Sequence, residues 1–186
     1  VEKLADGALT DINNGRIVGQ PLGIIYGYKT NGLFVDQAEI DAAPTQLVSK
    51  SSLKPGYVRY EDISGPDGVP DGVVNATYDR SVIGCTTPKY YYGINLTASY
   101  KGFDFSALLQ GLGGYDRLIG SYMAYAFYNG GQIQQWQVDN RWTVENPNKW
   151  AKYPRLETLN MNNTNLQTST YWLRDASFLR VKNVQV

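Results

Sequence analysis

The clearest alternation of hydrophobic and polar positions along the chain lies in residues 90–111. Between 90 and 100, the even-numbered positions carry aromatic or aliphatic side chains, and the odd-numbered positions are mostly polar or small. Alternate residues of a β-strand face opposite sides, so this segment predicts a strand with one apolar and one polar face. Lys101-Gly102 supplies a tight turn, after which the alternation resumes and only Leu108 interrupts it. The pattern predicts a β-hairpin.

Two kinds of protein contain such a hairpin. The first arm, 90–100, is as long as a tilted strand that crosses a lipid bilayer, which takes about 9–11 residues. Tyr100 and Phe103 flank the turn, where an interfacial belt of aromatic residues would lie. A soluble β-sandwich with one face on a core gives the same alternation, and alternation alone favours that common arrangement.

Further segments complete the predicted β-structure. We expect strands at about 15–28, 88–100, 103–112 and 171–186. Pro21 has no N–H to donate, so it should lie at a strand edge or a bulge. In the last segment the apolar positions change parity between Val181 and Val184. A β-bulge near Lys182-Asn183 would reconcile them.

The intervening segments, 29–87 and 113–170, lack sustained alternation and are interpreted as long loops. One short helical turn is expected at 36–44, with Asp36 as its N-cap and Glu39 three residues later.

The second loop combines Trp and Tyr with many Asn and Gln residues. This composition is typical of a surface that binds sugars or peptides, because aromatic faces stack on apolar ring faces while amides bond hydroxyl groups. Packing of the same rings against the loop's own scaffold is the alternative. The candidate contact residues for a ligand or a covering partner are Tyr125, Trp136, Trp142 and Trp150.

The composition excludes several function classes. The net charge is zero, so nothing points to a nucleic-acid partner. The chain has no histidine, which removes Ser-His and Cys-His catalysis and the commonest zinc ligand. No paired-carboxylate motif stands out. We therefore expect no catalytic residues, no cofactor and no enzymatic activity.

Three acidic residues are candidates for a metal site: Asp62, Asp67 and Asp71. An EF-hand calcium loop ends on a bidentate Glu at its twelfth position. Counted from Asp62, that position is Val73. The segment is therefore interpreted as a turn cluster of Asp, Gly and Pro residues, and no metal site is predicted there.

The chain is expected to be part of a longer protein. It begins with Val1 rather than Met, and no signal peptide is visible there. Its last residues lie inside the strand-like run 178–186.

Several sequence blocks, in this order, resemble one family. The most specific are DRSVIGCTTPKYYYGINLTASYKGFDFSALLQGLGG at 79–114 and YWLRDASFLRVKNV at 171–184. The others are GQPLGIIYGYKTNGLF at 19–34, YVRYEDI at 57–63, RWTVENPN at 141–148 and KYPRL at 152–156. Over most of its length the chain closely resembles the C-terminal barrel region of SusC/RagA-type TonB-linked outer-membrane transporters.

The resemblance implies an all-β fold whose antiparallel strands form part of a large (about 22-stranded) transmembrane β-barrel with long extracellular loops. Residues 1–186 would be part of the C-terminal barrel domain, without the N-terminal plug. It implies import of large nutrients, glycans or oligopeptides, through the outer membrane of a Gram-negative bacterium. The implied partners are a SusD-like surface lipoprotein, TonB through the missing N-terminal part, outer-membrane lipid and the ligand.

The same resemblance orients the predicted strands. Short turns lie at the periplasmic end of such barrels and long loops lie outside, so 29–87 and 113–170 become extracellular loops. The apolar face of the hairpin would face lipid, with Tyr92, Ile94, Leu96, Ala98, Phe105 and Leu109. The polar face would face the lumen, with Asn95, Thr97, Ser99, Asp104, Ser106 and Gln110.

The competing hypothesis is a soluble, secreted carbohydrate-binding β-sandwich module. Such a module must fold alone, with both edges of its sheets protected. Four strands taken from a barrel could not do so, because their lipid face and edges would be exposed.

Overall fold

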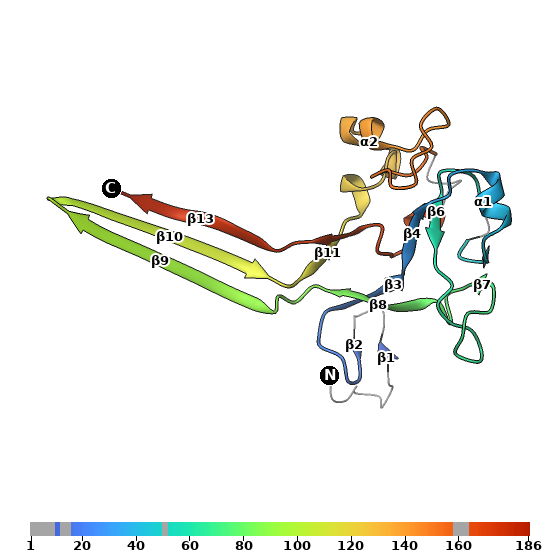
Figure 1. The fold of residues 1–186 in the computed structure, drawn as a ribbon, viewed down its shortest axis with the longest axis horizontal. Helices are drawn as coiled ribbons and strands as arrows, with labels where there is room; N and C mark the ends of the chain where they lie inside the picture. Colours follow the sequence, from blue (N-terminus) through green and yellow to red (C-terminus); the bar gives the residue numbers. More distant parts are fainter. Residues whose placement is uncertain (1–9, 12–15, 50–51, 158–163) are drawn as a thin grey trace. The chain divides into compact units, whose positions relative to one another are not determined.

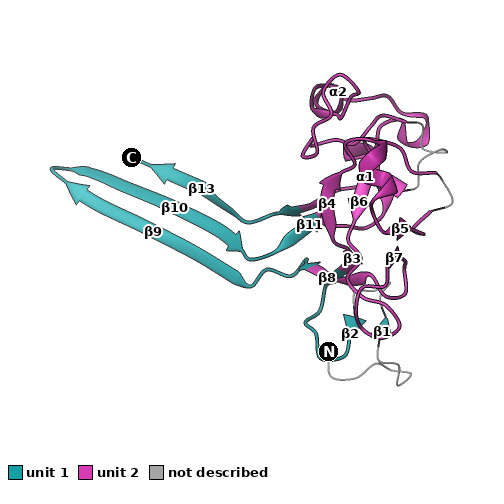
Figure 2. Cartoon of the chain, turned by 45° about the vertical axis from the view of Figure 1, so that its right-hand side comes forward, with its two compact units in different colours: residues 1–25, 84–117, 174–186 teal, residues 26–83, 118–173 magenta. Residues whose placement is uncertain are grey.

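The structure is a computed structural model that describes residues 10–11, 16–49, 52–157 and 164–186. These residues form mostly β-structure with a few short helices, and the longest strands pair antiparallel. The chain divides into two compact units: unit 1 holds 1–25, 84–117 and 174–186, and unit 2 holds 26–83 and 118–173 (Figure 2). Among the described residues, no helix is long and apolar enough to cross a membrane.

Unit 1 contains a three-stranded antiparallel sheet in the order β13-β10-β9 (Figure 1). Its strands are β9 (Tyr90–Tyr100), β10 (Phe103–Gly113) and β13 (Phe178–Gln185). β9 and β10 pair residue for residue along their whole length. At the turn, Lys101 has φ 50° and Gly102 has φ 89°, the two positive values that a two-residue type I′ turn requires. The predicted hairpin is confirmed.

β13 pairs with β10 through one irregularity. Val181 and Asn183 lie opposite neighbouring residues of β10, so Lys182 is an extra residue in β13. Such a β-bulge shifts the alternation of the strand by one position. Val184 therefore shares a face with Val181, and the predicted bulge at Lys182-Asn183 is confirmed.

A tyrosine on β9 reaches across β10 to the third strand. Tyr92 Oη donates a hydrogen bond to the carbonyl oxygen of Phe178 at 3.0 Å. The ring passes over Gly111, where an added Cβ would lie 2.2 Å from a ring carbon. Glycine makes room for the ring, and the ring covers the strand where glycine offers no side chain. This contact links all three strands at the end of the sheet opposite the hairpin turn.

The other sheets are two-stranded and short. Three of the pairs are β1 (Thr10–Asp11) with β2 (Arg16–Ile17), β3 (Ile24–Tyr28) with β8 (Arg80–Cys85), and β11 (Asp116–Leu118) with β12 (Leu173–Asp175). The other two pairs, in unit 2, are β4 (Thr30–Leu33) with β6 (Val58–Tyr60), and β5 (Thr45–Gln46) with β7 (Val73–Val74), the last pair being parallel. The helices are α1 (Gln37–Asp41), α2 (Gln135–Asn140) and the 3-10 turns η2 (Ser121–Met123), η3 (Tyr128–Gly130) and η5 (Thr164–Leu166).

The strand expected over 15–28 is interrupted. Within its described part, a turn at 18–23 separates β2 from β3. Gly19 and Gly23 both have positive φ, a conformation that ends a strand and favours glycine. A Cβ on Gly23 would lie 2.6 Å from the Thr86 hydroxyl oxygen, so the close approach of these two segments also requires glycine.

The strand expected over 171–186 is also divided. Its first part is β12, and it resumes only with β13. Between them, the Asp175 carboxylate accepts a hydrogen bond from the Ser177 N–H at 2.8 Å. This local bond stabilises a turn in place of a continuous ladder.

The short helix expected at 36–44 is present as α1. The Asp36 carboxylate accepts a hydrogen bond from the Glu39 N–H at 2.8 Å, and Glu39 Oε2 accepts one from the Val35 N–H at 2.8 Å. The two bonds satisfy donors at the start of the helix that have no intrahelical partner. The predicted N-cap is confirmed.

Unit 2 brings the two segments interpreted as long loops around cores of their own. One cluster contains Tyr28, Leu33, Val58, Tyr60, Val74, Trp142 and Ala151. A second contains Ala124, Ala126, Tyr153 and Trp172. The Trp172 ring meets Tyr153 and Tyr171 edge to face, with ring centroids 5.9 and 5.1 Å apart, a geometry that adds about 0.5–1.5 kcal/mol per pair beyond burial. These segments are therefore packed structure rather than open loop.

A partly buried carboxylate, Glu157, joins distant parts of unit 2. It accepts hydrogen bonds from Lys54 Nζ at 2.9 Å and Tyr57 Oη at 2.7 Å, and Arg155 Nε lies 3.5 Å away. Its side chain is 9% exposed. Burial acts to raise the pKa of Glu157, but the hydrogen bonds and charges of its neighbours outweigh burial and hold that pKa below its usual value.

We expect Gly111→Ala to destabilise the three-stranded sheet by about 1–3 kcal/mol, because the new Cβ displaces the Tyr92 ring. Gly93→Ala is the matched control on β9, since the nearest atom to its Cβ lies 3.8 Å away; we expect a change within about 0.5 kcal/mol. Urea unfolding of the protein that contains this chain measures both. Equal losses would contradict the Tyr92–Gly111 contact.

We expect Glu157→Gln to lower the free energy of unfolding at pH 7 by about 1–3 kcal/mol. The depressed pKa means that the stabilisation is present above the unfolded-state value, about 4.3, and is lost as the pH falls through the folded-state value. The difference between wild type and variant should therefore shrink below about pH 4.3. Urea unfolding at several pH values tests this, with Asp67→Asn in an exposed turn as the control. A difference that stays constant down to acid pH would refute the assignment.

Candidate functional site

The apolar face of the β13-β10-β9 sheet is exposed. The register places on it all six candidate lipid-facing residues, Tyr92, Ile94, Leu96, Ala98, Phe105 and Leu109. Val181 and Val184 extend the face onto β13. Leu96 is 51% exposed and Val181 62% exposed. A water-soluble sheet would bury such a continuous apolar face under a second layer.

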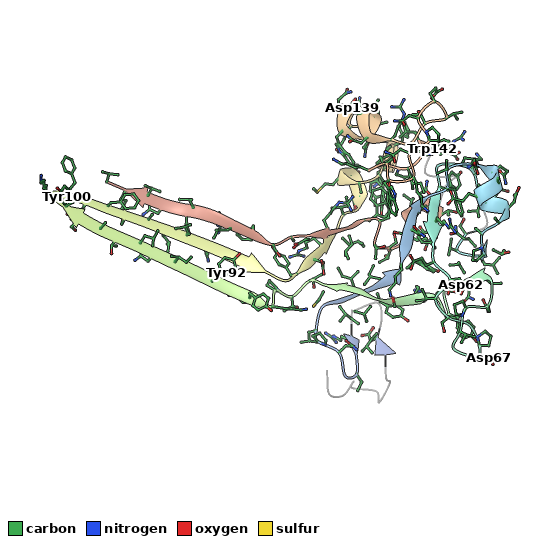
Figure 3. All side chains as sticks on the ribbon, viewed as in Figure 1. Asp62, Asp67, Tyr92, Tyr100, Asp139 and Trp142 are labelled. Carbon is green, nitrogen blue, oxygen red and sulfur yellow. The ribbon has the colours of Figure 1, made fainter. Side chains whose placement is uncertain are left out.

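Exposed aromatic side chains lie at both ends of this sheet. Tyr100 and Phe103 pair across the hairpin turn and are 71% and 73% exposed. At the other end of β9, Tyr90, Tyr91 and Tyr92 follow one another. Figure 3 labels Tyr92 and Tyr100 near the two ends of the strand. An apolar band flanked by two aromatic rows is the arrangement of a membrane-crossing β-sheet.

The opposite face of the sheet is polar. It carries all six candidate lumen-facing residues, Asn95, Thr97, Ser99, Asp104, Ser106 and Gln110. Several are linked across strands: Ser99 Oγ donates to Asp104 Oδ1 at 2.6 Å, and Lys182 Nζ donates to Gln110 Oε1 at 3.2 Å. The bulge residue Lys182 thus reaches the polar face.

Leu108, which breaks the alternation in the sequence, lies on the polar face opposite Asn95. It lines a shallow hollow of about 380 Å³ together with Tyr91, Gly93 and Lys182. Gly93 offers no side chain opposite Gln110, which leaves the hollow open. Leu108 therefore forms an apolar spot within the polar face of the sheet.

The four candidate aromatic residues of segment 113–170 have different surroundings. Trp142 is 3% exposed and belongs to the first core cluster, so it packs the scaffold and presents no face to a ligand. Tyr125 and Trp136 pack edge to face on Trp172 and Tyr153. Trp150 is 67% exposed. Of the four, Trp150 alone offers a largely open ring.

Two of the three candidate metal-site residues, Asp62 and Asp71, brace the turns of this region. Asp62 Oδ2 accepts a hydrogen bond from the Gly72 N–H at 2.7 Å, and Asp71 Oδ1 accepts one from the Val73 N–H at 2.9 Å. Asp67 lies exposed in the same turn region (Figure 3). Within the part of the chain that the structure describes, no three acidic, Cys or His side chains gather closely enough to hold a metal ion.

A fourth carboxylate, Asp79, organises this region and was missed by sequence reasoning. It is fully buried and accepts hydrogen bonds from the N–H groups of Ile63 at 2.8 Å, Ser64 at 3.3 Å and Asn75 at 2.7 Å. Two of these bonds reach back 15 and 16 residues. No local spacing marks such a residue, so only the folded chain identifies it.

The chain is similar in sequence to known proteins, although not to any family model. It is 30% identical over its whole length to TonB-dependent receptor P26 of Formosa agariphila, and it covers 17% of that protein. It is 27% identical over 89% of its length to TonB-dependent receptor P3 of the same organism, and it covers 15% of that protein. The chain thus spans less than a fifth of the curated relatives it matches.

A solved structure shares the fold. The RagAB peptide importer in its open-open state matches 98% of this chain with a TM-score of 0.60 and 24% sequence identity, and the match covers 18% of the longer chain. The β-rich architecture expected from the sequence blocks is therefore found in a known importer. The chain is homologous over its full length to part of the TonB-dependent receptors, and the predicted resemblance is confirmed.

Proposed function

We propose that this chain is a segment of a TonB-dependent outer-membrane transporter, and that its β13-β10-β9 sheet is part of the barrel wall. The exposed apolar face of this sheet carries the proposal. Leaving rows of Ile, Leu and Val side chains in water would be costly at about 25 cal/mol per Å². Contact with lipid removes that cost without any further protein layer.

The backbone supplies a second argument. β9 and β13 are the outer strands of the three-stranded sheet, each with one edge that β10 does not pair. Unpaired N–H and C=O groups cannot be left in the hydrocarbon core, so a membrane-crossing sheet must continue until it closes. Further strands from the rest of a longer polypeptide would close it into a large barrel, for which about 22 strands are expected.

The connections suggest an orientation. The turn at Lys101-Gly102 is as short as a turn can be, whereas the segments 29–87 and 113–170 are long and internally packed. Outer-membrane barrels have short periplasmic turns and long extracellular loops. We therefore assign the turn to the periplasm, the segments 29–87 and 113–170 to extracellular loops and the polar face to the lumen.

The imported cargo is a large nutrient, a glycan or an oligopeptide. The solved structure that shares the fold is that of a peptide importer, and the curated relatives are named as TonB-dependent receptors. We propose that the complete protein draws energy from TonB and works with a SusD-like surface lipoprotein, in the outer membrane of a Gram-negative bacterium. It moves its cargo without chemical change, so no residue here is assigned to catalysis.

Neighbouring residues on opposite faces of β9 test the lipid–lumen assignment. We expect Leu96→Arg to cost about 2–4 kcal/mol of folding free energy in a bilayer, because it places a charge in the hydrocarbon. Thr97→Arg lies at the same depth on the polar face and should cost much less. The measurement is urea unfolding of the complete protein in lipid vesicles. Similar losses for the two variants would rule out the assignment.

The cellular proposal is tested by the intact mass and location of the natural protein. We expect mass spectrometry of the outer-membrane fraction to find this sequence in a protein several times larger than 20.7 kDa, because a closed barrel with a plug needs many hundreds of residues (about 10 per strand before loops). A mature soluble protein of about 20.7 kDa would instead support the carbohydrate-binding β-sandwich.

A further inference from the structure

A polar hollow of about 190 Å³ lies in unit 2, outside the sheet discussed above. It lies between the C-terminal end of α2 and the segment that follows it, and Figure 3 labels Asp139 on that helix. The side chains that line it include Asp139, Arg141, Asn146, Asn148, Trp150 and Lys152. Ligand pockets for drug-sized molecules measure roughly 300–1,000 Å³. This hollow therefore suits a smaller unit, such as one ring of a longer chain.

The Trp150 ring beside the hollow is exposed but held in place. Its backbone N–H donates to Asn148 Oδ1 at 2.9 Å. One ring edge lies against Gly32, where an added Cβ would be 3.3 Å from Cε3. The Lys149 ammonium lies 5.6 Å from the ring centroid and 3.6 Å from Glu39 Oε1. An indole fixed in this way loses little conformational entropy when a ligand stacks on it.

The other lining groups offer both hydrogen-bond donors and acceptors. The Asp139 carboxylate accepts from Gln135 Nε2 at 2.7 Å and has further lone pairs. The Arg141 guanidinium donates one bond to the Val138 carbonyl at 2.5 Å and has five N–H donors in all. Asn146 adds an amide and Lys152 an ammonium group. Acidic, basic and amide groups in one hollow suit a ligand with many hydroxyl groups, each of which can donate and accept.

We propose that this hollow binds one pyranose unit of a glycan. The apolar face of the sugar ring stacks on Trp150, and its hydroxyl groups bond to Asp139, Arg141 and Asn146. An apolar ligand would leave these polar groups unpaired, which is costly. A simple anion could pair with Arg141 and Lys152, but it would leave the Asp139 carboxylate beside it and the Trp150 ring face unused. The inference rests on the proposed transport function and names the cargo class as a glycan rather than a peptide.

Binding by the complete protein in detergent tests the proposal. The protein is applied to an array of neutral and acidic plant, algal and bacterial glycans. A glycan that binds on the array is then titrated into the protein by calorimetry, and hexaalanine is titrated separately as the peptide comparison. We expect Trp150→Ala to weaken glycan binding about tenfold or more, and Trp150→Phe to restore part of it. Val144→Ala is the matched control, because Val144 is 70% exposed in the same segment but does not line the hollow.

Three results would overturn the proposal: no glycan is retained, Trp150→Ala binds as tightly as Val144→Ala, or hexaalanine is the ligand whose binding depends on Trp150. None of these affects the transport function, which depends on the size and outer-membrane location of the natural protein. A soluble 20.7 kDa protein that still binds sugar through Trp150 would, conversely, refute transport and retain the site.

Discussion

The three-stranded sheet depends on one constraint: three strands must present apolar side chains on the same face at the same time. β9 and β10 meet it by simple alternation, because their turn pairs them without slippage. β13 does not, since its apolar positions change parity along the strand. The extra residue Lys182 corrects this, and it also sends a lysine to the polar face. The bulge is thus a consequence of the two-faced pattern rather than a local defect.

Unit 2 depends on a different constraint. Its strands are short, so many of its backbone N–H and C=O groups have no partner in a strand ladder. Buried side chains supply hydrogen bonds to some of these groups. Gln46 receives the Tyr60 N–H at 2.6 Å and donates to the Val58 carbonyl at 3.3 Å. Gln137, which is fully buried, accepts the Gln134 N–H at 2.9 Å and donates to the Ala124 carbonyl at 3.1 Å. Because buried backbone groups must be paired, these amides allow a unit that has only short strands to pack tightly.

The features that could be predicted correctly from the sequence are those that depend on local patterns of residues. The hairpin, the bulge near Lys182 and the Asp36 N-cap each depend on residues a few positions apart. The packing of unit 2 does not: the Val58 N–H bonds to Asn165 and the Tyr60 hydroxyl bonds to Thr164, contacts that span more than a hundred residues. Composition marked Trp142 and Trp150 alike as candidate contacts. Only the fold separates the buried ring from the exposed one.

That separation bears on how a surface segment recognises a ligand. A long loop without internal packing would have to order itself when it binds, which opposes affinity. Unit 2 has already ordered its backbone around Trp142 and Trp172, so an exposed ring such as Trp150 is presented from a rigid base. Under the proposal above, the buried aromatic residues would contribute to recognition indirectly, because they fix the backbone that carries Trp150. In the proposed site, burial of Trp142 and Trp172 would therefore support binding by the exposed Trp150 ring.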